Sequence, residues 1–300
     1  MVQSQSQPIS APAIRAACRL GAAAKVAIEV VESTGSTNAD LLARAAATAT
    51  PATPASLAGP TVLVARRQTA GRGRAGRTWL SDAGSLTFSL AWRFQQPLSA
   101  LVGLPLAIGV ALVETLNAQG AGAQLKWPND VLVSGAKLAG ILIETVDMPT
   151  LLQPQAWAVI GVGINIDIDS GATSPAAAAP PAQPPMPALH GVQQQPATPA
   201  AALAATDRNL LLARLLDAFC TTLADFDAHG LAPFLARWNG LHAHAGRMVD
   251  ILERGAIVRS GRALGIDAMG RLLLETVNGT QAVLAGDVSL RLAKEQRCCS

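Results

Sequence analysis

Tyrosine is absent from this chain of 300 residues, and five tryptophans with five phenylalanines bring the aromatic fraction to only 3%. Charged residues are also scarce at 14%, and 23 basic residues against 20 acidic ones leave a net charge of only +3. So small a surplus excludes a general nucleic-acid binder, because neutralising phosphates requires a dense basic surface. We therefore expect any basic cluster to be a local site.

Long apolar runs are missing too. The longest, Leu98–Val113, contains Pro105 and is shorter than the roughly 18 to 20 charge-free residues of a membrane span, so no membrane segment is predicted. The N-terminus lacks the basic start and clean apolar stretch of a secretory signal, and we expect a flexible tail over residues 1–25. Four cysteines, at positions 18, 220, 298 and 299, lack metal-ligand spacing, which indicates reduced thiols and a cytoplasmic protein.

Half of the residues are apolar, which is enough for one large core or two modest ones. Apolar runs broken by turn residues predict short strands mixed with helices. The expected strands are Val26–Val31, Thr61–Ala65, Ser85–Phe94, Val131–Val133, Lys137–Val146 and Trp157–Asp167, and the expected helices are Ala39–Ala47, Ser99–Gln119 and Asp207–Phe226. This order predicts an α+β fold with hairpins rather than repeated βαβ units.

Two stretches differ in composition from the rest. Gly171–Ala200 contains eight prolines in thirty positions, so a flexible loop is expected over residues 171–205. From Gly246 onward, short β-like runs are separated by Arg-Gly, Met-Gly and Asn-Gly turns. This pattern favours a small separate barrel over residues 246–295, followed by a tail over residues 296–300.

An arginine-rich segment, Gly71-Arg72-Gly73-Arg74-Ala75-Gly76, formally matches the dinucleotide-binding pattern G-x-G-x-x-G. A strand precedes it, but no helix follows, and no acidic residue ends a second strand about 20 residues later, which excludes that interpretation. A Walker loop is excluded because Gly-Lys-Ser/Thr is missing. What remains is three arginines, Arg72, Arg74 and Arg77, on a glycine-rich backbone, which fit either an anion site or a solvated basic loop.

Two more segments combine polar residues with glycine. Lys126-Trp127-Pro128-Asn129-Asp130 precedes a predicted hairpin whose return strand has Lys137 at its mouth and Gly140 inside it. In Ile160–Ile166, alternation places Gly161, Gly163 and Asn165 on one face. Either a ligand or another backbone is expected against this bare face. Lys137 is either a ligand contact or a lysine that snorkels from a strand end.

Taken with Ser36-Thr37-Asn38, which is either a helix cap or a polar site, these segments resemble the biotin protein ligase family, also called biotin-[acetyl-CoA-carboxylase] ligases or holocarboxylase synthetases. The matching motifs are Ser36–Asn38, Gln68, Ala70–Trp79, Lys126–Asp130, Lys137–Gly140 and Gly161–Asn165, and the resemblance runs from Val30 to the C-terminus. It implies an α+β catalytic domain, expected over residues 26–245, with a mixed sheet and flanking helices like those of class II aminoacyl-tRNA synthetases. It also implies a small C-terminal SH3-like β-barrel.

The resemblance further implies a reaction in two steps. Biotin and ATP, with Mg²⁺, give biotinyl-5′-AMP and pyrophosphate, and biotin is then transferred to a lysine of a biotin carboxyl carrier protein, of acetyl-CoA carboxylase or of another biotin-dependent carboxylase. Arg72, Arg74 and Lys137 are the expected catalytic residues. The expected biotin-binding residues are Ser36, Thr37, Asn38, Gln68, Gly71, Arg72, Gly73, Arg74, Lys137 and Gly140; those for the adenylate and ATP are Arg74, Arg77, Trp79, Lys126, Asn129 and Asn165, and Asp130 is the expected metal ligand.

The chain departs from some family members. Only 35 residues precede Ser36, too few for the DNA-binding module of the members that repress biotin-synthesis genes, so we expect a monofunctional ligase that binds no DNA, as a monomer or weak homodimer. No aromatic residue lies between Ala158 and Arg208, where some members stack the adenine. His190, His229, His242 and His244 match no catalytic position, and His242-x-His244 is expected on the surface. The alternatives are a lipoate or octanoate ligase or transferase of related fold and a non-catalytic biotin sensor.

Overall fold

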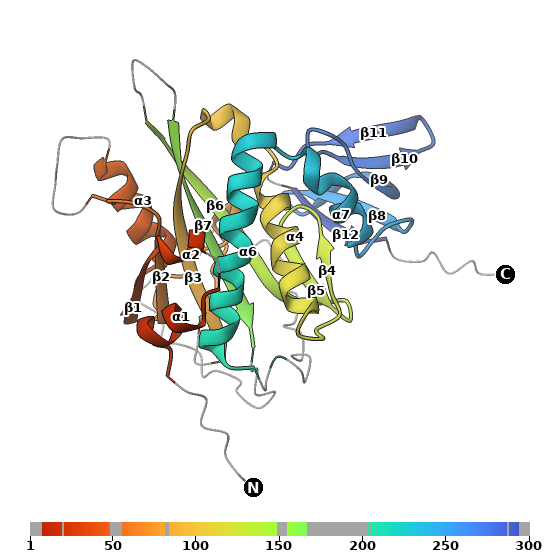
Figure 1. Ribbon diagram of the computed structural model, residues 1–300. Coiled ribbons are helices and arrows are strands. Elements are labelled where there is room, and N and C mark those ends of the chain that lie inside the picture. Colours follow the sequence, from red (N-terminus) through yellow and green to blue (C-terminus); the bar gives the residue numbers. More distant parts are fainter. Residues whose placement is uncertain are drawn as a thin grey trace, which may run out of the picture.

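The computed structural model of the chain describes residues 8–19, 21–48, 56–81, 84–148, 155–166, 203, 206–286 and 288–293. Its larger part is a seven-stranded sheet in the order β1-β2-β3-β7-β6-β5-β4 (Figure 1). The strands are β1 (Ala27–Thr34), β2 (Thr61–Gln68), β3 (Ser85–Phe94), β4 (Ala123–Lys126), β5 (Asp130–Val133), β6 (Ala136–Met148) and β7 (Gln155–Asn165). β1 pairs with β2 in parallel, and the other neighbours are antiparallel. The predicted α+β fold with a mixed sheet is confirmed.

Helices lie on both faces of this sheet. α4 (Leu104–Asn117) and α6 (Arg208–His229) pack against one face, and α1 (Ala11–Ala17) and α2 (Gly21–Ala24) contact α6 (Figure 1). α3 (Thr37–Thr48) packs against the opposite face. The shorter elements are α7 (Leu235–Gly240) and the 3₁₀ turns η1 (Arg74–Gly76), η2 (Leu98–Leu101) and η3 (Ala232–Phe234). Among the described residues, no helix is both long enough and apolar enough to span a membrane.

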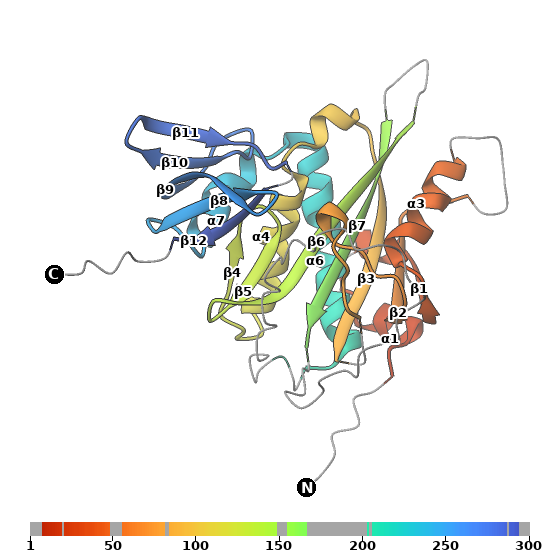
Figure 2. The ribbon, with the colours of Figure 1, turned by 180° about the vertical axis from the view of Figure 1, so that it is seen from behind.

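The sequence of β7 shows how the two faces are chosen. Ile160 and Val162 belong to the large core beneath α4 and α6, whereas Trp157 and Val159, of the other parity, belong to a smaller core beneath α3. Alternation along the strand then places Gly161, Gly163 and Asn165 on the α3 face. This is the bare face predicted above, and Figure 2 shows the sheet from this side.

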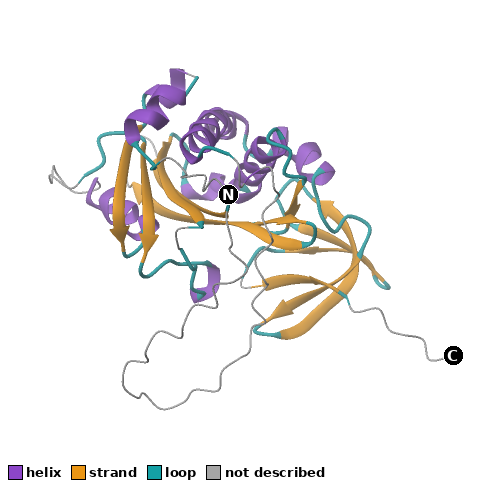
Figure 3. Ribbon diagram, turned by 90° about the horizontal axis from the view of Figure 1, so that it is seen from below, coloured by secondary structure: helices purple, strands orange, loops and turns teal. Residues whose placement is uncertain are grey.

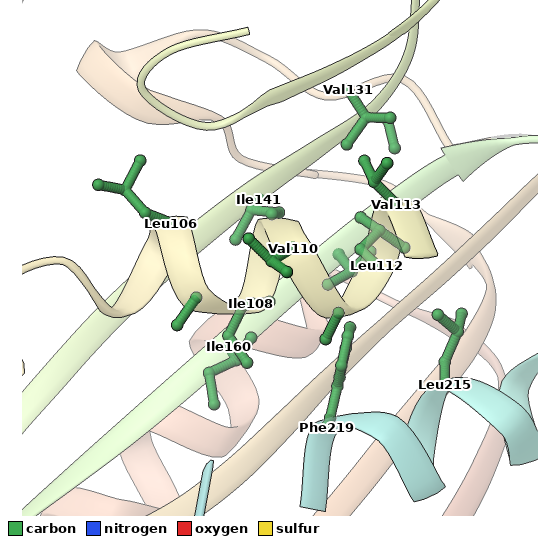
Figure 4. Packing of buried hydrophobic residues seen from close by; sticks show 14 of the residues in the cluster. Leu106, Ile108, Val110, Leu112, Val113, Val131, Ile141, Ile160, Leu215 and Phe219 are labelled. Carbon is green, nitrogen blue, oxygen red and sulfur yellow. The ribbon is translucent and has the colours of Figure 1, made fainter. Parts of the chain in front are cut away.

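α4 is buried nearly all round because it lies between the sheet and α6. In Figure 4, Ile108 and Val110 of α4 lie beside Ile141 and Ile160 of the sheet, and Phe219 of α6 approaches from the other side. The long helix predicted over residues 99–119 is shorter than expected. Gly103 adopts a left-handed conformation with φ 87°, which separates the turn η2 from α4.

The prediction of an N-terminal tail is wrong for residues 11–17 and 21–24, which form α1 and α2. Ile14 is completely buried, and the Asn209 amide oxygen of α6 accepts a hydrogen bond from Ser10 N at 2.8 Å. Ser10 caps α1, and proline is tolerated in its first turn. Helices this short are unstable alone, so their formation depends on packing against α6, which no local pattern in the sequence reveals.

The C-terminal part is a five-stranded antiparallel sheet in the order β11-β10-β9-β8-β12. Its strands are β8 (Met248–Glu253), β9 (Ala256–Ile266), β10 (Leu272–Thr276), β11 (Gly279–Val283) and β12 (Val288–Leu292). Figures 1 and 2 show it beside β4 and β5 of the larger sheet, and Figure 3 shows its strands at the side where the chain ends. The indole Nε1 of the buried Trp127 donates to the Gly270 carbonyl at 3.2 Å across this junction. β4 and β12 were not predicted, since both are short edge strands of mixed polarity.

His242 and His244 lie at the same junction, and the expectation that they are on the surface is wrong. They are 5% and 7% exposed, and the His242 ring stacks 4.7 Å from that of Trp238. Leu125 of β4 forms a bridge with His242. The pKa of both histidines is lowered to about 4, mainly by burial. The neighbouring His244 contributes to the lowered pKa of His242, and the charges of Lys126 and Arg247 contribute to that of His244.

Candidate functional site

A buried cluster of uncharged polar groups lies at the start of α3. The backbone N and the hydroxyl of Thr37 donate to Gln68 Oε1 at 2.8 and 3.1 Å. Ser89 Oγ of β3 donates to Asn38 Oδ1 at 2.7 Å and lies 2.7 Å from the Thr37 hydroxyl. None of these four side chains is more than 9% exposed, nor is Ser36. The cluster therefore holds hydroxyl and amide groups at one fixed place on the sheet.

Three same-face positions of β7 lead away from this cluster. A Cβ atom on Gly161 would lie 2.3 Å from Asn38 Oδ1, and one on Gly163 would lie 2.3 Å from the Trp79 indole. Asn165 Nδ2 donates to the Lys137 carbonyl at 3.4 Å. Same-face positions of a strand are about 6.6 Å apart. The face thus runs from a neutral polar cluster, across an indole ring, to a lysine.

Two lysines and one carboxylate form the charged end of this face. Lys137 Nζ lies 2.6 Å from Asp130 Oδ1, and Lys126 Nζ lies 3.6 Å from Asp130 Oδ2. Burial alone would raise the pKa of the Asp130 carboxyl, but the Lys137 and Lys126 charges outweigh it and hold the pKa below its usual value. Burial lowers the pKa of Lys126. Lys137 also lies 5.6 Å from the centre of the Trp79 ring, a cation–π arrangement.

The glycine–arginine loop, defined as residues 69–79, folds back on itself over this face. Gly73 N donates to the Arg77 carbonyl at 2.7 Å, and Trp79 N donates to the Gly71 carbonyl at 2.9 Å. A Cβ atom on Gly71 would lie 2.4 Å from the Trp79 carbonyl oxygen, so only glycine fits there. The close approach at Gly71 is to the backbone of the loop itself.

The arginines of the loop reach partners on three elements. Arg72 donates to Glu144 of β6 at 2.7 Å. Arg74 donates to Asn129 Oδ1 at 2.9 Å and to the Gly286 carbonyl of the C-terminal part at 2.5 Å. Asn129 is itself held by the Ile141 carbonyl, which accepts from its Nδ2 at 2.7 Å. Arg77 donates from Nε to the Arg74 carbonyl at 3.1 Å.

A cavity of about 960 Å³ opens beside the loop. It is lined by residues 69–78 of the loop, by Leu142 and Glu144 of β6, by Ala285 and Gly286 between β11 and β12, and by Val288 at the start of β12. Its size is that of a small-molecule site, and its arginines suit an anionic ligand. The cavity and the glycine face meet at Arg72 and Glu144, because Glu144 also accepts from Asn38 at 2.9 Å.

The structure brings together the residues singled out in the sequence. The neutral cluster contains Ser36, Thr37, Asn38 and Gln68, and the charged cluster contains Lys126, Asp130 and Lys137. Gly140 lies between the side chains of Lys137 and Trp79, because a Cβ atom on Gly140 would be 3.3 Å from atoms of both. Sequence analysis missed Ser89 and Glu144. The one signal in the sequence for each is that a polar residue stands in an otherwise apolar strand. Such a residue more often points to solvent, so the signal is weak.

Asp130 does not fit the expected metal site. Its carboxylate lies between two ammonium groups, whereas Mg²⁺ is held by carboxylates free to donate to it. Within the described ranges, no group of three or more histidine, cysteine, aspartate or glutamate side chains could hold a metal ion. We therefore assign Asp130 as the counter-ion of the two lysines.

Comparisons with known proteins agree on the family. Residues 52–165 match the Biotin/lipoate A/B protein ligase family, and residues 244–291 match the Biotin protein ligase C terminal domain. The chain is 36% identical over 234 residues to the bifunctional ligase/repressor BirA of Escherichia coli, which covers 77% of this chain and 67% of that protein. It is 35% identical over 272 residues to the biotin--[acetyl-CoA-carboxylase] ligase of Mycobacterium tuberculosis, which covers 87% of this chain and 88% of that protein.

The fold is also that of a solved relative. The structure of biotin protein ligase from Aquifex aeolicus in complex with biotin and ATP superimposes with a TM-score of 0.64 and 26% identity, covering 89% of this chain and 99% of that one.

Proposed function

Because the chain belongs to the biotin protein ligase family, we propose that it activates biotin with ATP and transfers it to a lysine of a biotin carboxyl carrier protein. The observation that carries this proposal is the order of groups along the glycine face, from neutral hydrogen-bonding side chains at Gly161 to a lysine beside Asn165. Biotin has the same order, with an uncharged ureido ring at one end and a carboxylate at the other.

The neutral end suits the ureido ring. Ser36, Thr37, Asn38 and Gln68 supply hydroxyl and amide groups that both donate and accept, as a urea requires. Gly161 and Gly163 leave the backbone bare, so that a flat ring could lie against the strand. In the present structure Trp79 covers Gly163, and its Nε1 is buried without a hydrogen-bond partner among the described residues. We infer that the indole shifts when biotin enters and then packs over it.

The charged end suits the first chemical step. A carboxylate oxygen of biotin attacks the α-phosphorus of ATP, a bond from carbon-bound oxygen to phosphorus forms, and pyrophosphate leaves. Both reactants are anionic, so the protein must neutralise their charge and hold them in line. We assign Lys137 of β6 and Arg72 and Arg74 of the loop to this junction, with Gly71, Gly73 and Gly140 leaving room for close approach. In the present structure, Arg72 pairs with Glu144 and Arg74 with Asn129.

The adenylate lies, in this proposal, on the loop side of the junction. Lys126 belongs to the charged cluster, and the residues around it are Arg77, Trp79, Asn129 and Asn165. Arg74 joins Asn129 to the C-terminal part. In the second step the acceptor amine attacks the acyl carbon of the adenylate, AMP leaves, and the amine loses a proton. Neither step needs a nucleophile from the protein.

The remaining proposals concern the partners, the oligomeric state and the compartment, as expected from the sequence. The acceptor is the carrier domain of acetyl-CoA carboxylase or of another biotin-dependent carboxylase, and DNA is not a partner. The protein acts as a monomer or weak homodimer. Cys18 and Cys220 are free thiols, which agrees with the reducing cytoplasm, where ATP is also found. MgATP is the nucleotide substrate we propose.

The test is the intact mass of a biotin carboxyl carrier domain after incubation with the purified chain, biotin, ATP and Mg²⁺. Lipoate and octanoate serve as parallel substrates, because the matched family includes lipoate ligases. We expect one biotin on one lysine and no lipoyl or octanoyl product. Acylation by lipoate or octanoate instead would favour the related ligase, and the absence of both product and biotin-dependent pyrophosphate would favour a biotin sensor.

A further inference from the structure

We propose that Glu144 is a positioning residue for biotin, because its carboxylate ties Arg72 of the glycine–arginine loop to Asn38 of the neutral cluster. The inference rests on the proposed function, in which Arg72 and Asn38 both contact the ligand. Glu144 lies outside every motif identified in the sequence, in the middle of β6. It is the point at which the cavity and the glycine face meet.

Both contacts go to the same oxygen of Glu144. Arg72 NH2 lies 2.7 Å from Oε2, and Asn38 Nδ2 lies 2.9 Å from it. The other end of the Asn38 amide, Oδ1, accepts from Ser89. An amide has one accepting and one donating end, so Ser89 and Glu144 together permit a single orientation of Asn38. Asn38 Nδ2 also donates to the Leu142 carbonyl at 3.3 Å, so Glu144 reinforces an orientation of Asn38 that the backbone of β6 also favours.

The second contact fixes the loop. The hydrogen bonds from Gly73 to Arg77 and from Trp79 to Gly71 are internal to the loop and do not place it on the sheet. The side chain of Arg72 ties the loop to β6 through Glu144, whose side chain is 25% exposed, and Arg74 ties it to Asn129. Within the described part of the chain, Arg72 has no other side-chain partner, so Nε and NH1 of its guanidinium remain available to a carboxylate.

The two contacts act in combination on a ligand. A ligand that contacts both Asn38 and Arg72 meets two neighbouring groups, and the shared carboxylate keeps these two groups at a constant separation. Without it, binding would have to order the arginine side chain and the Asn38 amide, which lowers affinity. Glu144 thus contributes to biotin affinity without touching the reacting atoms.

The experiment measures biotin affinity by titration calorimetry on the full chain. Glu144→Gln keeps an acceptor for Asn38 but removes the ion pair, and we expect Kd to rise about fivefold, the effect of a partly exposed ion pair. Glu144→Ala removes both contacts, and we expect Kd to rise at least about tenfold. Glu29→Gln is the matched control, because Glu29 forms a comparable ion pair with Arg44 at 2.8 Å, between β1 and α3. Its Kd should equal that of the wild type.

A double-mutant cycle separates positioning from a loss of folding. If Glu144 acts through Arg72, then Arg72→Ala with Glu144→Gln binds biotin no more weakly than Arg72→Ala alone. Three results would overturn the inference: additive losses in the double variant, an unchanged Kd in Glu144→Gln, or tighter biotin binding by Glu144→Gln. Tighter binding would mean that Glu144 competes with the ligand for Arg72. A wild-type chain that binds no biotin would instead overturn the proposed function.

Discussion

Gly161→Ala tests whether the bare face of β7 is required by Asn38. The added methyl would lie 2.3 Å from Asn38 Oδ1, so the amide must move away from the strand. Asn38 is 4% exposed and is held by Ser89 at 2.7 Å and by Glu144 at 2.9 Å. Losing two buried hydrogen bonds costs about 2 kcal/mol, and overpacking adds about 1 kcal/mol. We expect the free energy of unfolding to fall by about 3 kcal/mol.

Two other glycines make this prediction specific. A methyl on Gly163 would also be 2.3 Å from its neighbour, but that neighbour is the Trp79 indole, whose Nε1 has no hydrogen bond to lose among the described residues. Gly163→Ala should therefore cost only about 1 kcal/mol, from displacing the ring. Gly59 has nothing within 4 Å of its Cβ position, so Gly59→Ala should stay within about 0.5 kcal/mol of the wild type.

The assay is urea unfolding followed by circular dichroism, with equal m-values required for comparison. Biotin titration of the same variants adds a second measurement, and Kd should rise in Gly161→Ala and Gly163→Ala but not in Gly59→Ala. Asn38 is not rigidly held if Gly161→Ala is as stable as Gly59→Ala. The same conclusion follows if Gly163→Ala lowers the free energy of unfolding more than Gly161→Ala does.

Three further predictions concern charge. Lys137→Ala should reduce biotin-dependent pyrophosphate release at least about a hundredfold while changing biotin Kd far less, because its charge is needed where carboxylate meets phosphate; equal losses in both would show that Lys137 has been misplaced. Asp130→Asn leaves the nearly buried Lys126 without its counter-ion and should destabilise the protein by about 3 kcal/mol, with an unchanged Mg²⁺ requirement in the pyrophosphate assay; a raised Mg²⁺ requirement would restore Asp130 as a metal ligand. The pKa of His242 and His244 is about 4 in the folded protein, so as the pH falls these histidines are protonated in the unfolded chain before they are in the folded one. The free energy of unfolding should therefore be highest above about pH 6.5 and decrease as the pH drops toward 4. Urea midpoints at several pH values check this, and His242→Gln should flatten the slope.

Much of the fold could be predicted because it depends on local patterns. β3 begins and ends at the predicted residues, and Asp207 caps α6 as the start signal indicates. Alternation of glycine with branched apolar residues in β7 was sufficient to predict the glycine face. α1 and the buried pair His242 and His244 could not be predicted, because their burial depends on α6 and on the junction with the C-terminal part. These contacts join residues far apart in the chain.

The site shows the same division at the level of single side chains. The alternation of glycine with arginine in the loop is visible in the sequence, because few structural roles require that pattern. Glu144 carries none, because an acidic residue in a strand is normally a solvated outward-facing residue. Its role depends on the register of β6 and β7, which places it opposite Val159, within reach of Asn38 and Arg72.

The order of groups along β7 also bears on substrate choice. From Gly161 to Asn165 the strand advances by four residues, or about 13 Å, between a neutral polar cluster and the lysine end. An octanoyl or lipoyl chain could place its carboxylate at Lys137, but its other end has no group that hydrogen-bonds to Asn38 or Gln68. Covering this buried cluster with an alkyl chain leaves polar atoms without partners, and sites of this kind reject such analogues far more strongly than a purely apolar pocket does. The selectivity for biotin should therefore depend on the neutral cluster, and Gln68→Leu should lose affinity for biotin without a comparable loss in the charge-dependent steps at Lys137.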